Sequence, residues 1–334
     1  MSVFPKAGAF FPAFAVRRLA AARLPAFLLL FALLCAGPAA AAQRDGIYPG
    51  AELFSKTPLL TIAYCAETLG QVRPCASCGG KLGGLARRAG FIAGLRQEAA
   101  PLLFILGPGE FSADLAAAGR EQRAREGQLP VEQDESAADA GKVMAAYAAL
   151  RPQAACLSPE AGRWFRAGRV NIPEFFVPLS KMDGRAASRI VEIGGRTVGL
   201  VFFAEADGGL EQARAGALFA GRQLLPRVHL LVGVSPWGFA AEKDFLPEGA
   251  GLFHILLGGG SGPGFAVASS AQAGEILWAR PAAAGVGVNV ISLYRWPEAG
   301  PLRWENGLSF EARQEFLGPG LQEDPEIARL FAEP

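Results

Sequence analysis

The chain has 334 residues, of which 51% are hydrophobic, 10% aromatic and 19% charged. Basic residues number 32 and acidic residues 31, so the formal net charge is +1. This composition excludes a disordered polymer, and without a basic excess for contacts to phosphates we expect no nucleic-acid partner. The chain also has only two histidines, which argues against a metal centre built from several imidazoles.

Residues 1–42 have the order of charged, apolar and small residues that is typical of a secretory signal peptide. They contain four basic residues and no acidic one, with an apolar centre at 27–34 and four alanines at 39–42. We therefore expect a signal peptide at 1–42, an N-terminal extension at 43–57, and a periplasmic or secreted protein. Cleavage would leave 28 basic against 31 acidic residues, a net charge of −3. The alternative is an uncleaved membrane anchor, the one case in which we expect membrane contact.

Apolar runs that suit strands alternate with helical runs along the rest of the chain, which predicts α/β layers with a mixed sheet. In the first half, Arg87 and Arg88 are expected on the solvated face of a helix. The expected elements there are a strand at 59–64, a helix at 85–99, a strand at 102–106, an exposed helix and polar loop within 112–140, a helix at 142–150 and a strand at 153–157.

The second half contains more strand-like runs, and the absence of a repeat or a long linker favours one domain over 58–334. The expected elements are a hairpin of 189–193 with 197–203 around Gly194-Gly195, a helix at 210–225, strands at 228–234 and 253–257, a Gly-rich loop at 258–264, a closing strand pair of 276–280 with 286–294, and a helix at 324–332.

Several of these segments together resemble a known family. They are Leu60-Thr61-Ile62, Leu69-Gly70, Pro74-Cys75 and, most specifically, Leu-Gly-Gly-Leu-Ala-Arg-Arg-Ala at 82–89. This order resembles the start of the calcineurin-like metallophosphoesterases, in particular the N-terminal domain of periplasmic 5'-nucleotidases and UDP-sugar hydrolases. The resemblance covers about 58–333 and implies a four-layer α/β/β/α sandwich with mixed sheets, without the family's C-terminal nucleotidase domain.

The family's chemistry uses two metal ions held by Asp, Asn and His on the loops after the strands. In this chain the resemblance places other residues at most of those positions. Glu67 and Glu110 keep a carboxylate, each one methylene longer than Asp. The other positions fall on Leu69, on Pro159 and Glu160 after Ser158, on Pro236 after Ser235, and on Gly260 and Gly262. We therefore expect no metal cofactor; the alternative is a divalent cation on oxygen ligands, in an active phosphoesterase with an atypical metal site.

The cysteines offer a second kind of chemistry. Cys75-Ala76-Ser77-Cys78 is a Cys-x-x-Cys pair, which suits thiol–disulfide exchange or a local structural disulfide in an exported protein. Cys65 and Cys156 are expected near the carboxyl ends of their strands, either as inert buried thiols or as part of a thiol-lined cleft or a four-thiolate zinc site. The loop around Cys75 also resembles that of exported UDP-sugar-hydrolase-like proteins, some of which contain selenocysteine.

Other residues carry weaker signals. Trp237 and Ser235 are cleft candidates, although a core aromatic is an equal alternative for Trp237. The loop at 258–264 is either an anion-binding nest or a simple Gly-rich turn, and His229 and His254 are expected to be structural. The function we expect is an exported metallophosphoesterase-fold protein that has lost di-metal hydrolysis and acts in small-molecule binding or thiol chemistry. The alternatives are an active nucleotidase-type hydrolase and a structural partner of another envelope protein.

Overall fold

The computed structural model describes residues 57–75, 81–111, 140–180, 183–269, 276–297 and 303–332. All of them belong to Pro49–Pro334, one of the two units into which the chain divides. The expected signal peptide, the expected extension up to residue 56, residues 112–139 and Cys78 lie outside the described residues. None of the helices within the described ranges has the length and apolar character needed to cross a bilayer.

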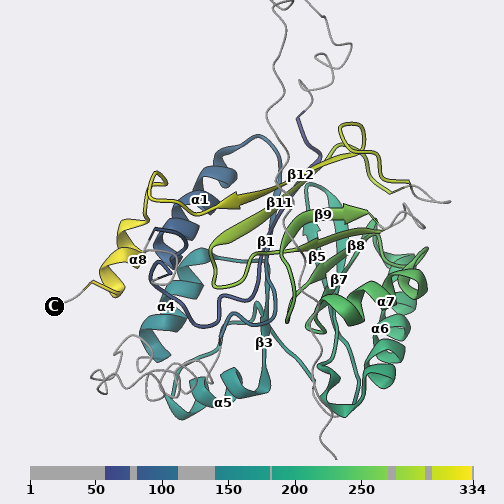
Figure 1. The fold of residues 1–334 in the computed structure, drawn as a ribbon, viewed down its shortest axis with the longest axis horizontal. Helices are drawn as coiled ribbons and strands as arrows, with labels where there is room; N and C mark the ends of the chain where they lie inside the picture. The colour runs from purple at the N-terminus through teal and green to yellow at the C-terminus, as the bar shows by residue number, and fades with distance from the viewer. Residues whose placement is uncertain are drawn as a thin grey trace, which may run out of the picture. The chain divides into compact units, whose positions relative to one another are not determined.

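Two six-stranded sheets form the centre of the fold (Figure 1). In the first, a run of four parallel strands is extended on one side only by two strands that pair antiparallel, and in the second, a parallel middle section has one antiparallel strand on each side. The first sheet has the order β12 (Phe310–Phe316), β11 (Gly287–Leu293), β1 (Leu60–Cys65), β2 (Leu102–Leu106), β3 (Ala154–Leu157) and β4 (Phe176–Pro178). The second has the order β5 (Ala187–Ile193), β6 (Arg196–Phe202), β7 (Leu230–Ser235), β8 (Ile255–Gly258), β10 (Leu277–Arg280) and β9 (Phe265–Ser269).

The main core lies between the two sheets, and strand β1 shows how the sequence produces it. Successive side chains of a strand point to opposite faces of the sheet. Leu60, Ile62 and Tyr64 accordingly pack with apolar residues of the second sheet, whereas Ala63 and Cys65 pack against helices. Every residue of β1 is buried, because both faces of its sheet are covered.

Helices cover the outer face of each sheet, which gives four layers in the order α/β/β/α. The first sheet is covered by α1 (Leu85–Gln97), α4 (Ala140–Leu150), α5 (Pro159–Ala167) and α8 (Pro325–Leu330). The second is covered by α6 (Leu210–Leu224) and α7 (Phe239–Gly249). Short 3₁₀ turns lie at Ala206–Gly208 and Leu225–Arg227. The predicted four-layer fold with mixed sheets is confirmed.

The expected closing strand pair of 276–280 with 286–294 is wrong. Strand β10 belongs to the second sheet, where it pairs with β8 and β9, and β11 belongs to the first, where it pairs with β1 and β12. The connection between them carries Ala284 and Gly285 at positive φ, and it takes the chain from one sheet to the other. Every residue of both strands is buried, so each strand lies inside a sheet with a partner on both sides. Pairing with each other would have given each strand only one of these partners.

The loops that follow β1 and β2 lie against each other at one edge of the first sheet. The backbone N–H groups of Glu67, Leu69 and Gly70 donate to the carbonyls of Pro108, Gly109 and Glu110, at 2.9, 2.7 and 3.0 Å. Strands β1 and β2 are parallel, so their carboxyl ends meet at the same edge. The Tyr64 hydroxyl links this edge to the second sheet by donating to the Gly258 carbonyl, at 3.1 Å.

Candidate functional site

The loops after β1 and β2 enclose a buried cluster of four polar side chains, named here the Arg88 cluster: Thr68, Arg88, Glu110 and Tyr147. Arg88 comes from α1 and donates from one nitrogen to Glu110 Oε2 at 2.8 Å and from another to Thr68 Oγ1 at 2.5 Å. The hydroxyls of Thr68 and Tyr147 both donate to Glu110 Oε2, each at 2.8 Å. Arg88 is 1% exposed and Glu110 is 2% exposed, so this ion pair is isolated from solvent.

The expectation that Arg88 lies on a solvated helix face is therefore wrong. Arg88 lies three residues after Leu85 and four before Ile92, which places it on the same face of the helix as these two buried residues. The sequence contained this signal, because a charged residue at an apolar position of a helix indicates a buried partner. Its neighbour Arg87 lies nearer the surface, where it pairs with Glu323 at 3.0 Å.

Burial and the facing carboxylate act in opposite directions on the charge of Arg88. Burial, the largest single effect, lowers the pKa of the guanidinium, but the adjacent Glu110 carboxylate together with Cys65 and Tyr147 raises it above its usual value. The pKa of Tyr147 is raised well above its usual value, first by burial and then by the same carboxylate. Tyr147 thus remains a neutral donor, and Arg88 remains the cation of the cluster.

A second buried ion pair lies in the other half of the fold, and we name it the Arg280 cluster: Glu242, Trp278, Arg280 and the backbone of 259–263. Arg280 is 2% exposed and Glu242 is fully buried. The two side chains form a close hydrogen bond, and Trp278 donates its indole N–H to the same carboxylate at 2.9 Å. Arg280 also donates to the carbonyls of Gly260 and Ser261, at 2.9 and 3.0 Å, and of Pro263 at 3.2 Å.

Glu67 connects the two sheets at this edge. Its Oε1 accepts the backbone N–H of Gly260 at 2.5 Å, across from β1 to the loop after β8. Burial raises the pKa of Glu67, and the Gly260 hydrogen bond opposes that shift. Glu67 also has a positive φ of 54°, in the left-handed region that non-glycine residues adopt at an energetic cost. The backbone N–H groups of the Gly-rich loop therefore face carboxylates of the chain itself, since the Gly259 N–H donates to Glu242 at 3.0 Å.

Gly260 and Gly262 fall on two ligand positions, and neither has room for a side chain. Gly260 has a φ of 70°, and a Cβ there would lie 2.6 Å from the Pro236 carbonyl oxygen. Gly262 has a φ of 122°, and a Cβ there would lie 2.4 Å from the Phe239 Cβ. Histidine at either position would require the backbone to move.

The remaining ligand positions also carry no metal-binding group aimed at a shared point. Leu69 is apolar, with a φ of 57°. Ser158 caps α5 by accepting the Ala161 N–H, Pro159 is the first residue of that helix, and Glu160 pairs with Arg163 at 2.8 Å. In the loop after β7, Ser235 is buried and accepts the N–H of Trp237 at 3.2 Å, and Pro236 lies between them.

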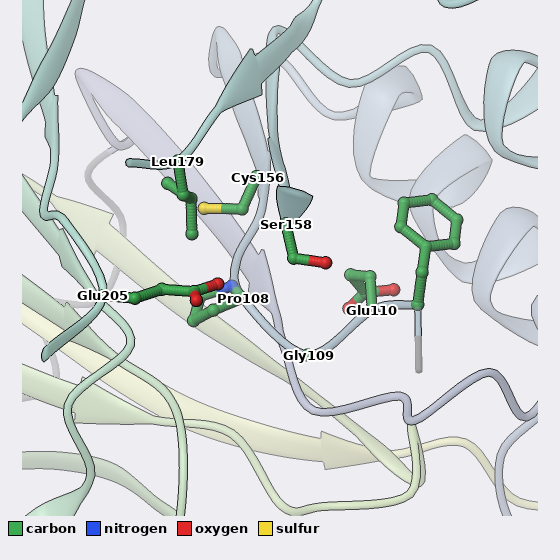
Figure 2. Close-up of a pocket in the computed structure, with 8 residues that line it drawn as sticks. Pro108, Gly109, Glu110, Cys156, Ser158, Leu179 and Glu205 are labelled. Atoms are coloured by element: carbon green, nitrogen blue, oxygen red, sulfur yellow. The ribbon is translucent and has the colours of Figure 1, made fainter. Parts of the chain in front are cut away.

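A small pocket lies beside Glu110, formed by the loop after β2, the end of β3 and the segments after β4 and β6 (Figure 2). Its volume is about 30 Å³, which holds a few water-sized molecules and not a nucleotide. The second carboxylate oxygen of Glu110, Oε1, has no partner among the described residues. The residues that line the pocket are Pro108, Gly109, Glu110, Phe111, Cys156, Ser158, Leu179 and Glu205.

The described cysteines are all buried, and they do not meet at one point. Cys65 packs on the helix side of the first sheet, and Cys156 packs on the side of the second sheet. Both are free thiols; burial raises the pKa of Cys65 to about 12 and that of Cys156 well above its usual value. Cys75 is 1% exposed and its N–H donates to the Leu82 carbonyl at 2.8 Å. Because Cys65 and Cys156 lie on opposite faces of the sheet, they cannot bind one zinc ion together.

The two histidines and Trp237 make structural contacts. His229 and His254 each accept a backbone N–H at Nδ1, from Thr197 at 3.2 Å and from Leu231 at 2.8 Å. Burial lowers the pKa of His254 to about 4. Trp237 donates its indole N–H to the Ala204 carbonyl at 2.7 Å and packs on Phe203, with ring centres 4.7 Å apart.

These contacts decide whether the residues present fit a di-metal centre. Across the described ranges, His, Cys, Asp and Glu side chains nowhere form a group of three or more that could hold a metal ion. Glu110 is bound to a guanidinium and two hydroxyls, and Glu67 to a backbone N–H. Of the other ligand positions only Glu160 has a metal-binding side chain, and it pairs with Arg163. The donor set therefore does not fit two metal ions.

Comparison with solved structures places this fold beside a calcineurin-like phosphoesterase, a 5'-nucleotidase precursor and a sulfate thiohydrolase. Calcineurin-like phosphoesterase YfkN from Bacillus subtilis matches with a TM-score of 0.52 and 14% identity, over 81% of this chain and 95% of that one. The 5'-nucleotidase precursor from Thermus thermophilus matches with a TM-score of 0.53 and 14% identity, over 81% of this chain and 57% of that one. The sulfate thiohydrolase SoxB from Thermus thermophilus matches with a TM-score of 0.55 and 11% identity, over 82% of this chain and 60% of that one.

These likenesses establish the fold and confirm the resemblance inferred from the sequence. The chain spans less than two thirds of the 5'-nucleotidase precursor and of SoxB, so the activities of those whole proteins do not carry over. No family model matches the chain, and no curated protein matches it in sequence.

The buried carboxylate of Glu67 gives a pH-dependent prediction. Its pKa in the folded protein is raised above the ordinary value of 4.5, so the ionised form costs stability at neutral pH, and this cost disappears as the pH falls below 4.5. Glu67→Gln keeps an oxygen for the Gly260 N–H and removes the charge. We expect its Tm to exceed that of the wild type by a few degrees at pH 7, with the difference shrinking toward pH 4.

The matched control is Glu192→Gln, at an exposed glutamate of β5, for which no such pH-dependent difference is expected. Thermal unfolding at pH 4, 5, 6 and 7 provides the comparison. A Glu67→Gln variant that is less stable than the wild type at pH 7 would show that the ionised carboxylate is required.

Proposed function

We propose that this chain is an exported phosphoesterase-fold protein that does not hydrolyse phosphate esters and that acts by binding a partner in the cell envelope. The observation that carries the proposal is the engagement of Glu110, whose Oε2 receives hydrogen bonds from Arg88, Thr68 and Tyr147. A carboxylate that holds metal ions needs free oxygens, whereas Oε2 of Glu110 is bound to an internal cation and two hydroxyls, and only Oε1 has no partner among the described residues.

The Gly-rich loop after β8 supports the same proposal. Gly260 and Gly262 replace two ligand histidines and have no space for a side chain, and Arg280 fixes the loop that contains them. The pocket beside Glu110 holds about 30 Å³, far less than a nucleotide or a UDP-sugar requires. We expect a partner to bind on the outside of the fold, and a small molecule in this pocket would have to be of water size.

Export is part of this proposal, and it rests on the sequence. The basic, apolar and small-residue order of residues 1–42 supports a signal peptide and a location in the periplasm or outside the cell. The Cys-x-x-Cys pair also suits an exported protein, because disulfides persist in oxidising compartments.

The absence of hydrolysis is tested with the purified wild type and a Glu110→Ala variant prepared in the same way. We expect both to turn over 5'-AMP, UDP-glucose and p-nitrophenyl phosphate at the same background rate in Mg²⁺, Mn²⁺, Ca²⁺ or Zn²⁺. We also expect metal analysis of the wild type to find far less than one ion per chain. The variant controls for a contaminating phosphatase, because a contaminant is unaffected by the substitution. A metal-dependent rate that the wild type shows and Glu110→Ala lacks would contradict the proposal and favour the active hydrolase.

For the cysteines we propose structural roles: a local Cys75–Cys78 disulfide and two inert thiols. Thiol–disulfide exchange needs an accessible thiolate, and the buried Cys65 and Cys156 have pKa values raised far from neutrality. Cys75 is also buried, and its backbone is held by Leu82. Redox chemistry remains the competing proposal, supported by the spacing of the Cys-x-x-Cys pair.

Thiol labelling followed by peptide mass spectrometry separates these two proposals. In the native protein we expect no labelling at any of these four cysteines. In denaturant without reductant, Cys65 and Cys156 should be labelled, and Cys75 and Cys78 should be labelled only after reduction. Labelling of Cys75 or Cys78 in the native protein, or a midpoint potential well above about −300 mV, would favour the redox role.

A further inference from the structure

We propose that two buried arginines, Arg88 and Arg280, provide from within the chain the positive charges that hold the loops at the strand ends together. This inference rests on the proposed absence of hydrolysis and states what replaces the metal ions. Each guanidinium contacts loops that, by the family resemblance, would carry metal ligands. Arg88 contacts the loops after β1 and β2, and Arg280 contacts the loop after β8.

Arg88 links elements that a metal ion would otherwise connect. Thr68 follows β1, Glu110 follows β2, Tyr147 comes from α4 and Arg88 itself from α1. The planar fork of a guanidinium presents several N–H groups in fixed directions, so one side chain can bind two partners on separate loops at 2.8 and 2.5 Å. The arginine therefore places a positive charge between the loops after β1 and β2, which by the family resemblance would carry metal ligands.

Arg280 joins separate elements of the second sheet in a similar way. It extends from the end of β10, pairs with Glu242 of α7, and donates to three carbonyls of the loop that follows β8. Glu242 in turn accepts the Gly259 N–H of that loop. The Gly-rich loop is thereby held through its carbonyls by a cation and through an N–H by an anion.

The charges of the two clusters balance. Glu110 and Glu242 are matched by Arg88 and Arg280. Glu67 lies between the clusters as a third carboxylate, with a raised pKa and a backbone N–H as its partner. A guanidinium has only N–H donors, so it has no open coordination position at which a water molecule is activated. Such a site keeps the architecture of the loops and lacks the Lewis acid.

If the inference is correct, the positive charge at position 88 contributes to the stability of the fold separately from the packing of the side chain. Arg88→Lys keeps the charge on a similar length of chain, and Arg88→Met keeps the length without the charge. Arg88→Ala removes both and leaves space beside Glu110. The control is Arg87→Met, on the same turn of α1, where the ion pair with Glu323 lies near the surface.

We expect Arg88→Met to lower the Tm by about 5–10 °C and Arg88→Lys to lower it clearly less, because an unpaired buried carboxylate remains only in the first. Arg87→Met should stay within about 2 °C of the wild type. Addition of 10 mM guanidinium chloride should raise the Tm of Arg88→Ala relative to 10 mM NaCl, whereas the wild type and Arg87→Met should show no such rise.

Equal Tm values for Arg88→Lys and Arg88→Met would overturn the inference, and so would a folded Arg88→Ala variant that guanidinium does not stabilise. If Arg88→Ala does not fold, the comparison of Lys with Met decides alone. These outcomes are distinct from failure of the proposed function, which is detected as metal-dependent turnover by the wild type. The Tm values of the arginine variants test the inference independently of the result of the turnover assay.

Discussion

The ion pair between Arg88 and Glu110 is the interaction on which the rest of the site depends. Removing two charges from water is costly, and the attraction between them offsets that cost only when the remaining polar atoms are well bonded. Thr68 and Tyr147 supply two such bonds to Oε2 of Glu110, whereas Oε1 and Arg88 Nε have no partner among the described residues. A buried pair of this kind contributes little net stability, but loss of one partner costs about 3–5 kcal/mol. Its main effect is to require one arrangement of the loops around it.

That arrangement accounts for how the two carboxylates at the strand ends are engaged by other groups of the chain. The carboxylate after β2 is saturated on one oxygen by donors of the chain itself, and the carboxylate after β1 is turned toward the Gly-rich loop. The loop after β8 lies close to its neighbours, with glycine where a side chain would collide with backbone or with Phe239. The small volume beside Glu110 follows from this packing.

The sequence predicted the fold well where the pattern of apolar residues was strong. Strand β2 begins and ends where the apolar run at 102–106 does, and the helix predicted at 85–99 corresponds to α1. Helix α7 and strand β12 were not predicted. Pro247 lies inside α7 and obscures its pattern, and β12 is only partly buried, so its alternation is weak. The pairing of β10 and β11 with different sheets depends on contacts between distant segments, which a local pattern does not contain.

For the site, the family resemblance indicated positions that depart from the family's ligand pattern, but not the contacts that the residues there make. The family resemblance located Glu67, Glu110, Gly260 and Gly262, and the structure brings their loops together. The sequence did not identify Arg88, Glu242 or Arg280 as members of buried ion pairs, because their partners are distant in sequence. Arg88 and Glu110 are 22 residues apart, and Glu242 and Arg280 are 38 apart. The position of Arg88 on the apolar face of its helix was the one available local signal.

A double-mutant cycle on Arg88 and Glu110 tests the central claim most directly. The free energy of unfolding in urea would be measured for the wild type, Arg88→Met, Glu110→Gln and the double variant. If the pair is the internal charge partnership described above, Arg88→Met should cost about 3–5 kcal/mol, and the double variant should be destabilised by at least about 1 kcal/mol less than the sum of the single variants. Additive effects within about 0.5 kcal/mol would show that the two residues act independently and would contradict the account.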